Sequence, residues 1–77
     1  MIAEQCRAAR AWLEWSQDDL ATNASVSNST VRDFEAGRRV PIANNLAAMK
    51  AALEKAGTSF VDDAGTWGIT YAKRKRR

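Results

Sequence analysis

The segment SQDDLATNASVSNSTVRDFEAG, residues 16–37, contains two short helical patterns separated by a break. Ser16 is a good N-cap for the first helix, and acids follow it in the first turn, where the helix dipole favours them. After the break, Ser27 can cap a second helix, and Gly37 suits the left-handed position just past its end. Because a helix of barely two turns is weak on its own, the first helix is expected to support the second.

A helical wheel divides residues 27–36 into an apolar and a polar face, with Val31 and Phe34 toward the core. The polar face holds small or hydrogen-bonding residues: Asn28, Ser29, Arg32, Asp33 and Ala36. Arginine can donate twice to guanine, asparagine can pair with adenine, and aspartate can accept from cytosine. Such a face is more often plain solvated surface, but its chemistry matches the edges of bases.

Helical spacing also appears on both sides of this segment. An amphipathic stripe precedes it at Ile2, Cys6, Ala9 and Leu13, and another follows it at Leu46, Met49, Leu53 and Ala56. The later helix is expected to close at Gly57. Its start is open, because Pro41 suits a first turn and Asn44 could serve as a cap.

Beyond Gly57 the pattern changes to the alternation typical of a β-strand. Trp67, Ile69 and Tyr71 alternate with small or polar residues after the turn-rich stretch DDAGT. The segment predicts either a private hairpin or an edge strand that pairs with its copy in a second chain. Pairing between chains is preferred, because an exposed aromatic edge would promote aggregation, and these three residues are therefore candidates for dimerisation.

Composition restricts the function classes. Seventy-seven residues make one small domain, and one cysteine without any histidine leaves neither a disulfide nor a metal site. Histidine is also the commonest general base, so we expect no enzyme and no cofactor, and no small-molecule substrate is evident. The sequence has no apolar run long enough to span a membrane and no secretory signal, which favours a cytoplasmic protein.

The net charge of +3 is unevenly distributed. The tail KRKRR, residues 73–77, holds five of the twelve basic residues, which leaves seven basic against nine acidic residues elsewhere, a net charge of −2. The tail is expected to be disordered and to strengthen non-specific attraction to phosphates.

Arg10 and the stretches WSQDDLA (15–21), VSNSTVRDFEAGRRVP (26–41) and LAAMKAAL (46–53) resemble the phage-repressor-like helix-turn-helix family. This is the Cro/cI or xenobiotic-response-element group, and the resemblance covers about residues 2–57. It implies an all-α, lambda-repressor-like bundle of four to five short helices, to which the alternating segment adds a short C-terminal β-strand or hairpin. The expected organisation is a DNA-binding domain over residues 1–57, a β-like extension over 58–72 and the basic tail over 73–77.

The resemblance implies a regulator, usually a transcriptional repressor, that reads the major groove of a palindromic operator in double-stranded DNA as a homodimer. Asn28, Ser29, Arg32 and Asp33 would contact bases. Gln17, Ser27, Thr30, Arg38, Arg39, Lys73 and Arg74 are the residues expected at phosphates. Arg10 and Glu35 match the family's structural ion pair, which ties the first helix to the third.

Two positions depart from the family, which often has glycine where this chain has Glu14 and Ser25. A left-handed conformation at Ser25 would cost about 1 kcal/mol relative to glycine. Trp12 fits either the margin of the core or a contact with a partner. The alternative function is a DNA-binding antitoxin or protein-interaction module, because the C-terminal strand is more apolar than a linker needs to be and could bind a partner protein.

Overall fold

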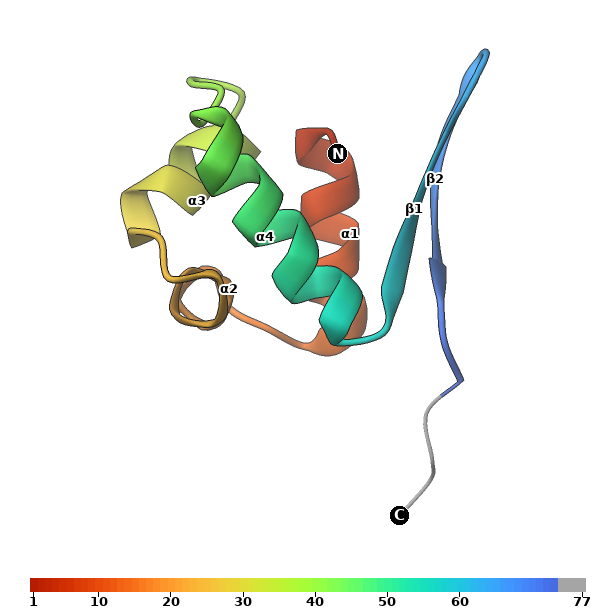
Figure 1. Ribbon diagram of the computed structural model, residues 1–77, viewed down its shortest axis with the longest axis horizontal. Coiled ribbons are helices and arrows are strands. Elements are labelled where there is room, and N and C mark those ends of the chain that lie inside the picture. The colour runs from red at the N-terminus through yellow and green to blue at the C-terminus, as the bar shows by residue number, and fades with distance from the viewer. Residues whose placement is uncertain (74–77) are drawn as a thin grey trace.

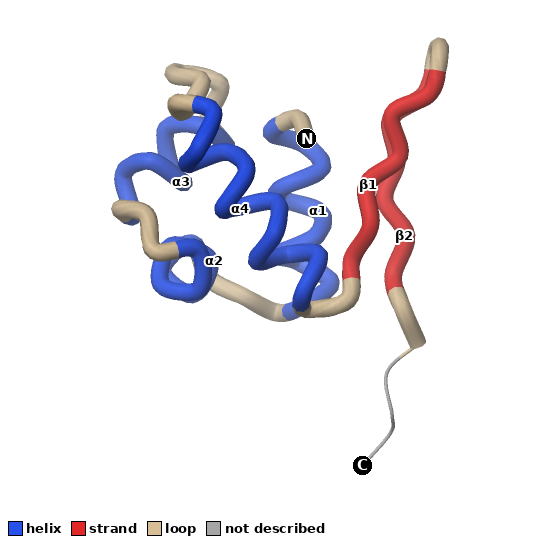
Figure 2. Tube along the Cα trace, viewed as in Figure 1, coloured by secondary structure: helices blue, strands red, loops and turns tan. Residues whose placement is uncertain are grey.

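The computed structural model describes residues 1–73, in which four helices precede one β-hairpin (Figure 1). The helices are α1 (Ala3–Leu13), α2 (Gln17–Ala24), α3 (Asn28–Glu35) and α4 (Ala43–Lys55), and the strands are β1 (Thr58–Asp63) and β2 (Thr66–Tyr71). Figure 2 shows the hairpin beside the helical bundle, with α3 at the other end of the molecule. The expected helix-turn-helix bundle with a C-terminal hairpin is confirmed.

The ends of α2 and α3 follow the capping chemistry of the sequence. The Oγ atom of Ser16 accepts a hydrogen bond from the backbone of Asp19 at 2.9 Å, and that of Ser27 accepts one from Thr30 at 3.2 Å. Gly37 adopts the expected left-handed conformation, with φ of 74°. The caps therefore fix where both helices of the helix-turn-helix begin.

Both expectations for the start of α4 are wrong. Its first helical residue is Ala43, so Pro41 lies before the helix and Asn44 lies within the first turn. Ile42 is the N-cap residue, and its carbonyl accepts the first helical hydrogen bond, from Leu46 at 3.0 Å. The helix thus starts without a side-chain cap, and its position is set by burial of its apolar residues.

The hydrophobic core lies between the four helices and contains the residues expected from the helical spacing. Its buried members are Cys6, Ala9, Leu13, Leu20, Ala21, Ala24, Val31, Phe34, Met49 and Leu53. Trp15, Leu46 and Ala56 are partly buried against this core. Every helix contributes, so α3 is packed from behind by the rest of the bundle.

The hairpin pairs within the chain. β1 and β2 are antiparallel, Val61 lies opposite Gly68, and Ala64 and Gly65 form the turn. This short turn supplies a partner strand directly, so the hairpin alternative is present within the chain, and pairing of β2 with its copy in a second chain stays a prediction. One edge of β2 is paired in this way, and the other edge is taken up below.

One face of the hairpin lies on the helices. Phe60 and Ile69 pack against the core, and the ring of Tyr71 stacks on that of Trp12 with a centroid distance of 4.3 Å. Trp12 therefore lies at the margin between α1 and the hairpin. Of the aromatic strand residues, only Trp67 is exposed, with 62% of its surface accessible.

Gln5 is the polar attachment between α1 and the hairpin. Its side chain is buried, and Nε2 donates to the carbonyl oxygens of Val61 at 3.0 Å and Gly68 at 2.8 Å. Its Oε1 accepts from the backbone N–H of Ile2 at 2.9 Å. One side chain thus caps α1 and ties it to both strands.

Candidate nucleic-acid interface

The polar face of α3 lies on the surface at the end of the molecule farthest from the hairpin (Figure 1). Ser29 and Arg32 are exposed, and Asn28 and Asp33 are half-buried. The Arg32 side chain keeps 55% of its surface accessible. No other part of the described chain covers this face, so the residues expected to contact bases are accessible from solvent.

A buried carboxylate holds the C-terminal end of α3 in place. The Glu35 side chain is only 3% exposed and forms a bidentate salt bridge with Arg10. The Arg10 Nε atom lies 2.7 Å from Oε2 and Nη2 lies 2.6 Å from Oε1. The ion pair that the family resemblance implied is present, and it joins α1 to α3.

Glu35 also receives three further donors. Nε2 of Gln17 donates to its Oε1 at 3.0 Å, and the Cys6 thiol donates to its Oε2 at 3.1 Å. Nη1 of Arg7 donates to its backbone carbonyl at 2.6 Å. Donors from α1 and α2 therefore converge on the last residue of α3. Gln17 braces α3 through this carboxylate, and its expected phosphate contact stays a prediction.

The Glu35 joint, which is the contact of Glu35 with Arg10, Gln17 and Cys6, keeps Glu35 and Arg10 charged at neutral pH. Burial would raise the pKa of Glu35, but hydrogen bonds from Arg10, Gln17 and Cys6 outweigh burial and hold it below its ordinary value. Burial, followed by the hydrogen bond to Glu35, raises the pKa of the Cys6 thiol, which therefore stays a protonated donor. The hydrogen bond to Glu35 also raises the pKa of Arg10.

Two of the expected base-contacting side chains are held by carboxylates. Nδ2 of Asn28 donates to Oδ1 of Asp18 on α2, and Nε of Arg32 lies 3.6 Å from Oδ1 of Asp33. The sequence analysis placed Asp18 only in the first turn of α2, because a contact ten residues away has no local signal. Asp18 therefore orients Asn28, whereas the exposed Arg32 has an acid beside it without a hydrogen bond among the described residues.

A hollow of about 320 Å³ lies between α3 and the segment that leads into α4. It is lined by Ser29, Thr30, Asp33, Arg39, Val40, Pro41, Ile42 and Asn45. Val40 and Ile42 are 76% and 70% exposed, although the sequence analysis treated their segment only as a connector. The sequence signal for this apolar wall is the presence of Val40 and Ile42 directly after the two arginines.

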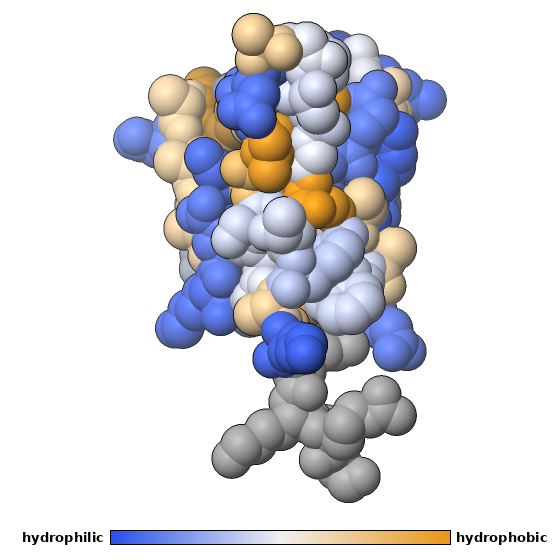
Figure 3. All heavy atoms as spheres, turned by 90° about the vertical axis from the view of Figure 1, so that its right-hand side faces the viewer, coloured by the Kyte–Doolittle hydropathy of each residue, from blue (hydrophilic) through white to orange (hydrophobic). Residues whose placement is uncertain are grey.

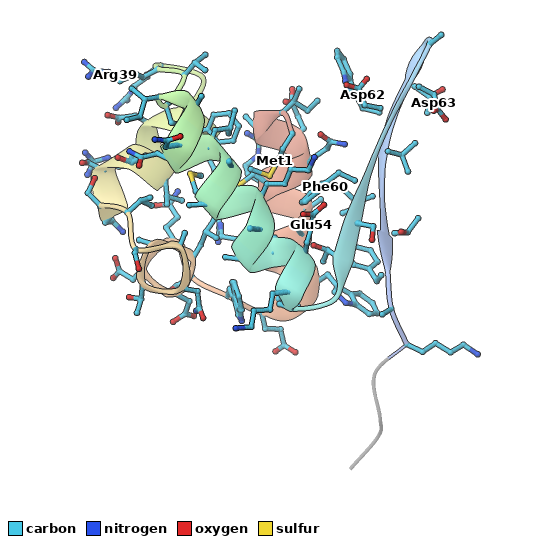
Figure 4. All side chains as sticks on the ribbon, in the orientation of Figure 1. Met1, Arg39, Glu54, Phe60, Asp62 and Asp63 are labelled. Carbon is cyan, nitrogen blue, oxygen red and sulfur yellow. The ribbon has the colours of Figure 1, made fainter. Side chains whose placement is uncertain are left out.

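The residues expected to contact phosphates fall into two groups. Ser27, Thr30, Arg38 and Arg39 lie at the two ends of α3, where the Ser27 hydroxyl lies 2.8 Å from that of Thr30. Figure 4 shows Arg39 at the α3 end of the molecule and Asp62 and Asp63 at the hairpin tip. Lys73 follows β2 and is not brought to α3, and Arg74 lies outside the described residues.

Within residues 1–73, no cluster of histidine, cysteine or acidic side chains could hold a metal ion. In the same residues, no helix is both long and apolar enough to cross a membrane. The candidate site is therefore a polar helix face that is braced from behind and flanked by exposed cations. Such a surface can bind and discriminate, and it presents hydrogen-bonding groups at fixed positions.

Comparison with known families identifies a helix-turn-helix domain. A family model described as a helix-turn-helix domain matches residues 2–62, from the start of α1 into β1. A search of curated proteins gives no match. The matched range covers α2, α3 and their connecting turn, and so includes the whole candidate interface.

Proposed function

The chain belongs to the helix-turn-helix domain family, within the Cro-like and xenobiotic-response-element superfamily, and on this basis we propose a sequence-specific transcriptional repressor. Family membership indicates a DNA-binding regulator in general terms. The proposal adds that α3 enters the major groove and that two copies bind one palindromic operator. A regulator of this kind would act on DNA in the cytoplasm.

The observation that carries this proposal is the exposed polar face of α3 on a rigid support. A reading helix must hold its side chains in place, because ordering them on binding would cost affinity. The Glu35 joint fixes the helix axis, and Asp18 restrains Asn28. Side chains arranged before binding favour discrimination between bases over simple attraction to phosphates.

The charges around α3 support a role for each residue. Arg32 is the best candidate for a bidentate contact with guanine, and Asn28 can pair with adenine. Asp33 would be repelled by phosphates alone, but it lies beside Arg32 and could accept from cytosine. Exposed Arg38 and Arg39 follow the helix and supply positive charge for the DNA backbone.

A dimer follows from the small size of this interface. One α3 presents only four candidate base-contacting side chains, which can distinguish few base pairs. Two copies on half-sites about 34 Å apart double the sequence read and match the two-fold symmetry of a palindrome. Repression would then follow from occupying a promoter rather than from chemistry at the site.

The test is selection of bound duplexes from random DNA by the native chain and by Arg32→Ala. We expect Arg32→Ala to lose about 1–3 kcal/mol of discrimination at one base pair in each half-site. Lys55→Ala is the control, since it removes the same charge from the far end of α4. An unchanged base preference in Arg32→Ala would remove this residue from the reading set, and equal losses in both variants would indicate non-specific binding.

The second candidate is an antitoxin or interaction module that binds a partner protein through its C-terminal strand. Exposed Trp67 favours it, because a large aromatic side chain on a strand is a common protein contact. Purification of the native chain from its source cells with a stoichiometric protein on the hairpin would support this function.

A further inference from the structure

We propose that the outer edge of β2 is the surface through which two copies of this chain pair, giving a continuous four-stranded antiparallel sheet. The inference rests on the proposed function because binding of a palindromic operator requires a dimer. Three features of the hairpin support it: unpaired backbone groups, an edge without charge, and a symmetric arrangement of aromatic and charged residues.

The register shows which backbone groups of β2 point outward. Ala72 donates to the carbonyl of Gly57 at 2.8 Å, and hydrogen-bonded pairs alternate with non-hydrogen-bonded pairs along an antiparallel ladder. Trp67, Ile69 and Tyr71 therefore occupy the non-hydrogen-bonded positions, and their N–H and C=O groups point away from β1. Among the described residues these groups have no hydrogen-bond partner, so the edge is ready to receive a strand.

The edge of β2 lacks the usual protection against pairing. The strand reads TWGITY and has no charged residue or proline, whereas β1 carries the exposed residues Asp62 and Asp63. Within residues 1–73, α1 contacts this strand through the hydrogen bond from the Tyr71 hydroxyl to the carbonyl of Ala8 at 3.3 Å. Ala8 is exposed and small, which leaves room for a second chain.

The outer face of the hairpin is a weaker candidate for the same contact. Figure 3 looks onto this face, where residues of intermediate and apolar character occupy the middle. The strand residues that alternate with the inward-facing ones are mostly serine, threonine and glycine, and Val61 is the apolar exception. Such a face offers little apolar area for stacking, so pairing is expected at the edge.

If two β2 edges pair antiparallel, the two-fold axis is expected to lie at Ile69. Ile69 would lie opposite its own copy, and Trp67 would lie opposite Tyr71 of the second chain, so that all outward backbone groups are paired. Trp67 would then lie beside the ring pair formed by Tyr71 and Trp12 of the second chain. This arrangement accounts for an exposed tryptophan on the strand, because the second copy covers it.

Charges at the two ends of the hairpin complement each other in this arrangement. Asp62 and Asp63 lie near the turn, as Figure 4 shows, and Lys73 follows the other end of β2. With Ile69 on the two-fold axis, Lys73 of one copy lies opposite Gly65 of the other and close to Asp63. Four further residues, Arg74 to Arg77, add to the positive charge of the tail. The two-fold axis repeats this attraction at both ends.

The resulting dimer is compatible with binding to one face of DNA. Two antiparallel copies of one strand are related by an axis perpendicular to their sheet, which places both helical bundles on the same side. Since α3 lies at the end of the bundle away from the hairpin, both α3 helices would be directed away from the shared sheet (Figure 1). The same edge pairing therefore brings two reading helices to one side of the dimer.

The experiment compares two proline substitutions on one rung of the hairpin. Trp67 and Asp62 are opposite each other, both are exposed, and the backbone N–H of each points outward, so proline at either position removes no hydrogen bond from the hairpin. In sedimentation equilibrium without DNA, the native chain of 8.5 kDa should dimerise reversibly. Trp67→Pro should weaken dimerisation at least about tenfold, and Asp62→Pro less than about threefold.

Amide exchange of the native chain provides a test that does not depend on a variant. The amides of Trp67, Ile69 and Tyr71 should become protected as the protein concentration rises, while that of Phe60 on the β1 edge should not. This measurement decides the matter if Trp67→Pro fails to fold.

Three results would overturn the proposal. A native chain that is monomeric at all concentrations would leave the edge to a strand of another protein. A folded Trp67→Pro that dimerises normally would place the interface elsewhere, as would an equal loss in folded Asp62→Pro. Because Arg32→Ala should still dimerise, failure of the edge proposal is distinguishable from failure of DNA reading.

Discussion

The two ends of the molecule are attached to α1 by different kinds of polar contact. At the α3 end, Arg10 and Glu35 are opposite charges on two side chains. At the hairpin end, neutral Gln5 donates to two backbone carbonyls. A charged pair demands a specific residue on each element, whereas a contact with backbone carbonyls places no demand on the strand's side chains. The first attachment can therefore be recognised in a sequence and the second cannot.

The two attachments also differ in their response to pH. The pKa of Glu35 is lower in the folded chain than its ordinary value, so its contribution to stability is present above the unfolded pKa of about 4.3. That contribution is lost as the pH falls through the folded pKa. Gln5 does not titrate, so the hairpin attachment should be the one that persists in acid.

The largest expected effect comes from breaking the charged attachment with Arg10→Ala. Because the Glu35 carboxylate would stay buried without its cation, we expect a loss of about 3–5 kcal/mol in the free energy of unfolding, measured with urea. Arg7→Ala is the control, since Arg7 contacts only the backbone carbonyl of Glu35 and should cost about 1 kcal/mol. Equal losses would mean that the side-chain pair is not what holds α3.

A smaller effect is expected at the hairpin from Gln5→Glu, which preserves the shape of the side chain and removes its donor. The carbonyls of Val61 and Gly68 lose the Gln5 donor and keep only their partners in the ladder, so we expect a loss of about 1–3 kcal/mol in the free energy of unfolding. Glu4→Gln, the reverse change at the exposed neighbouring position, should cost less than about 0.5 kcal/mol. If Gln5→Glu unfolds like the native chain, then Phe60 and Ile69 dock the hairpin alone.

The smallest effect concerns the turns between the elements and has the opposite sign. Glu14 and Ser25 both have φ of 57°, so the strain considered for Ser25 is real and is shared by Glu14. Ser25→Gly and Glu14→Gly should each raise the free energy of unfolding by about 0.5–1 kcal/mol, measured by thermal denaturation. Ala36→Gly, at a right-handed position with φ of −82°, should lower it instead. A gain at Ala36 as well would show that glycine stabilises these positions for a reason other than relief of left-handed strain.

Local chemistry explains what could be predicted from the sequence. Ser16, Ser27 and Gly37 mark helix ends through contacts within a few residues, and the apolar stripes locate the core. The start of α4 was missed because burial, not a capping side chain, sets it. The hairpin contacts of Gln5 and the link from Asp18 to Asn28 join distant parts of the chain, and no periodic pattern indicates them.

The sequence alone could not decide between the two partners considered for β2. Alternation in TWGITY indicates a strand with two different faces, and it does not show how many partner strands its edges have. The turn at Ala64 and Gly65 provides one within the chain. The family resemblance identified Arg10 with Glu35 because both are side chains at fixed positions, whereas the contacts of Cys6 and Arg7 with Glu35 have no such signal.

The reactivity of Cys6 can be used to measure how often α1 and α3 separate. Its thiol is fully buried, donates to Glu35 and is the single cysteine of the chain. A thiol-specific reagent can therefore label the folded protein only when α1 separates from α3. The labelling rate of the unmodified protein then reports how often α3 loses its support, and DNA bound at the proposed interface should slow it.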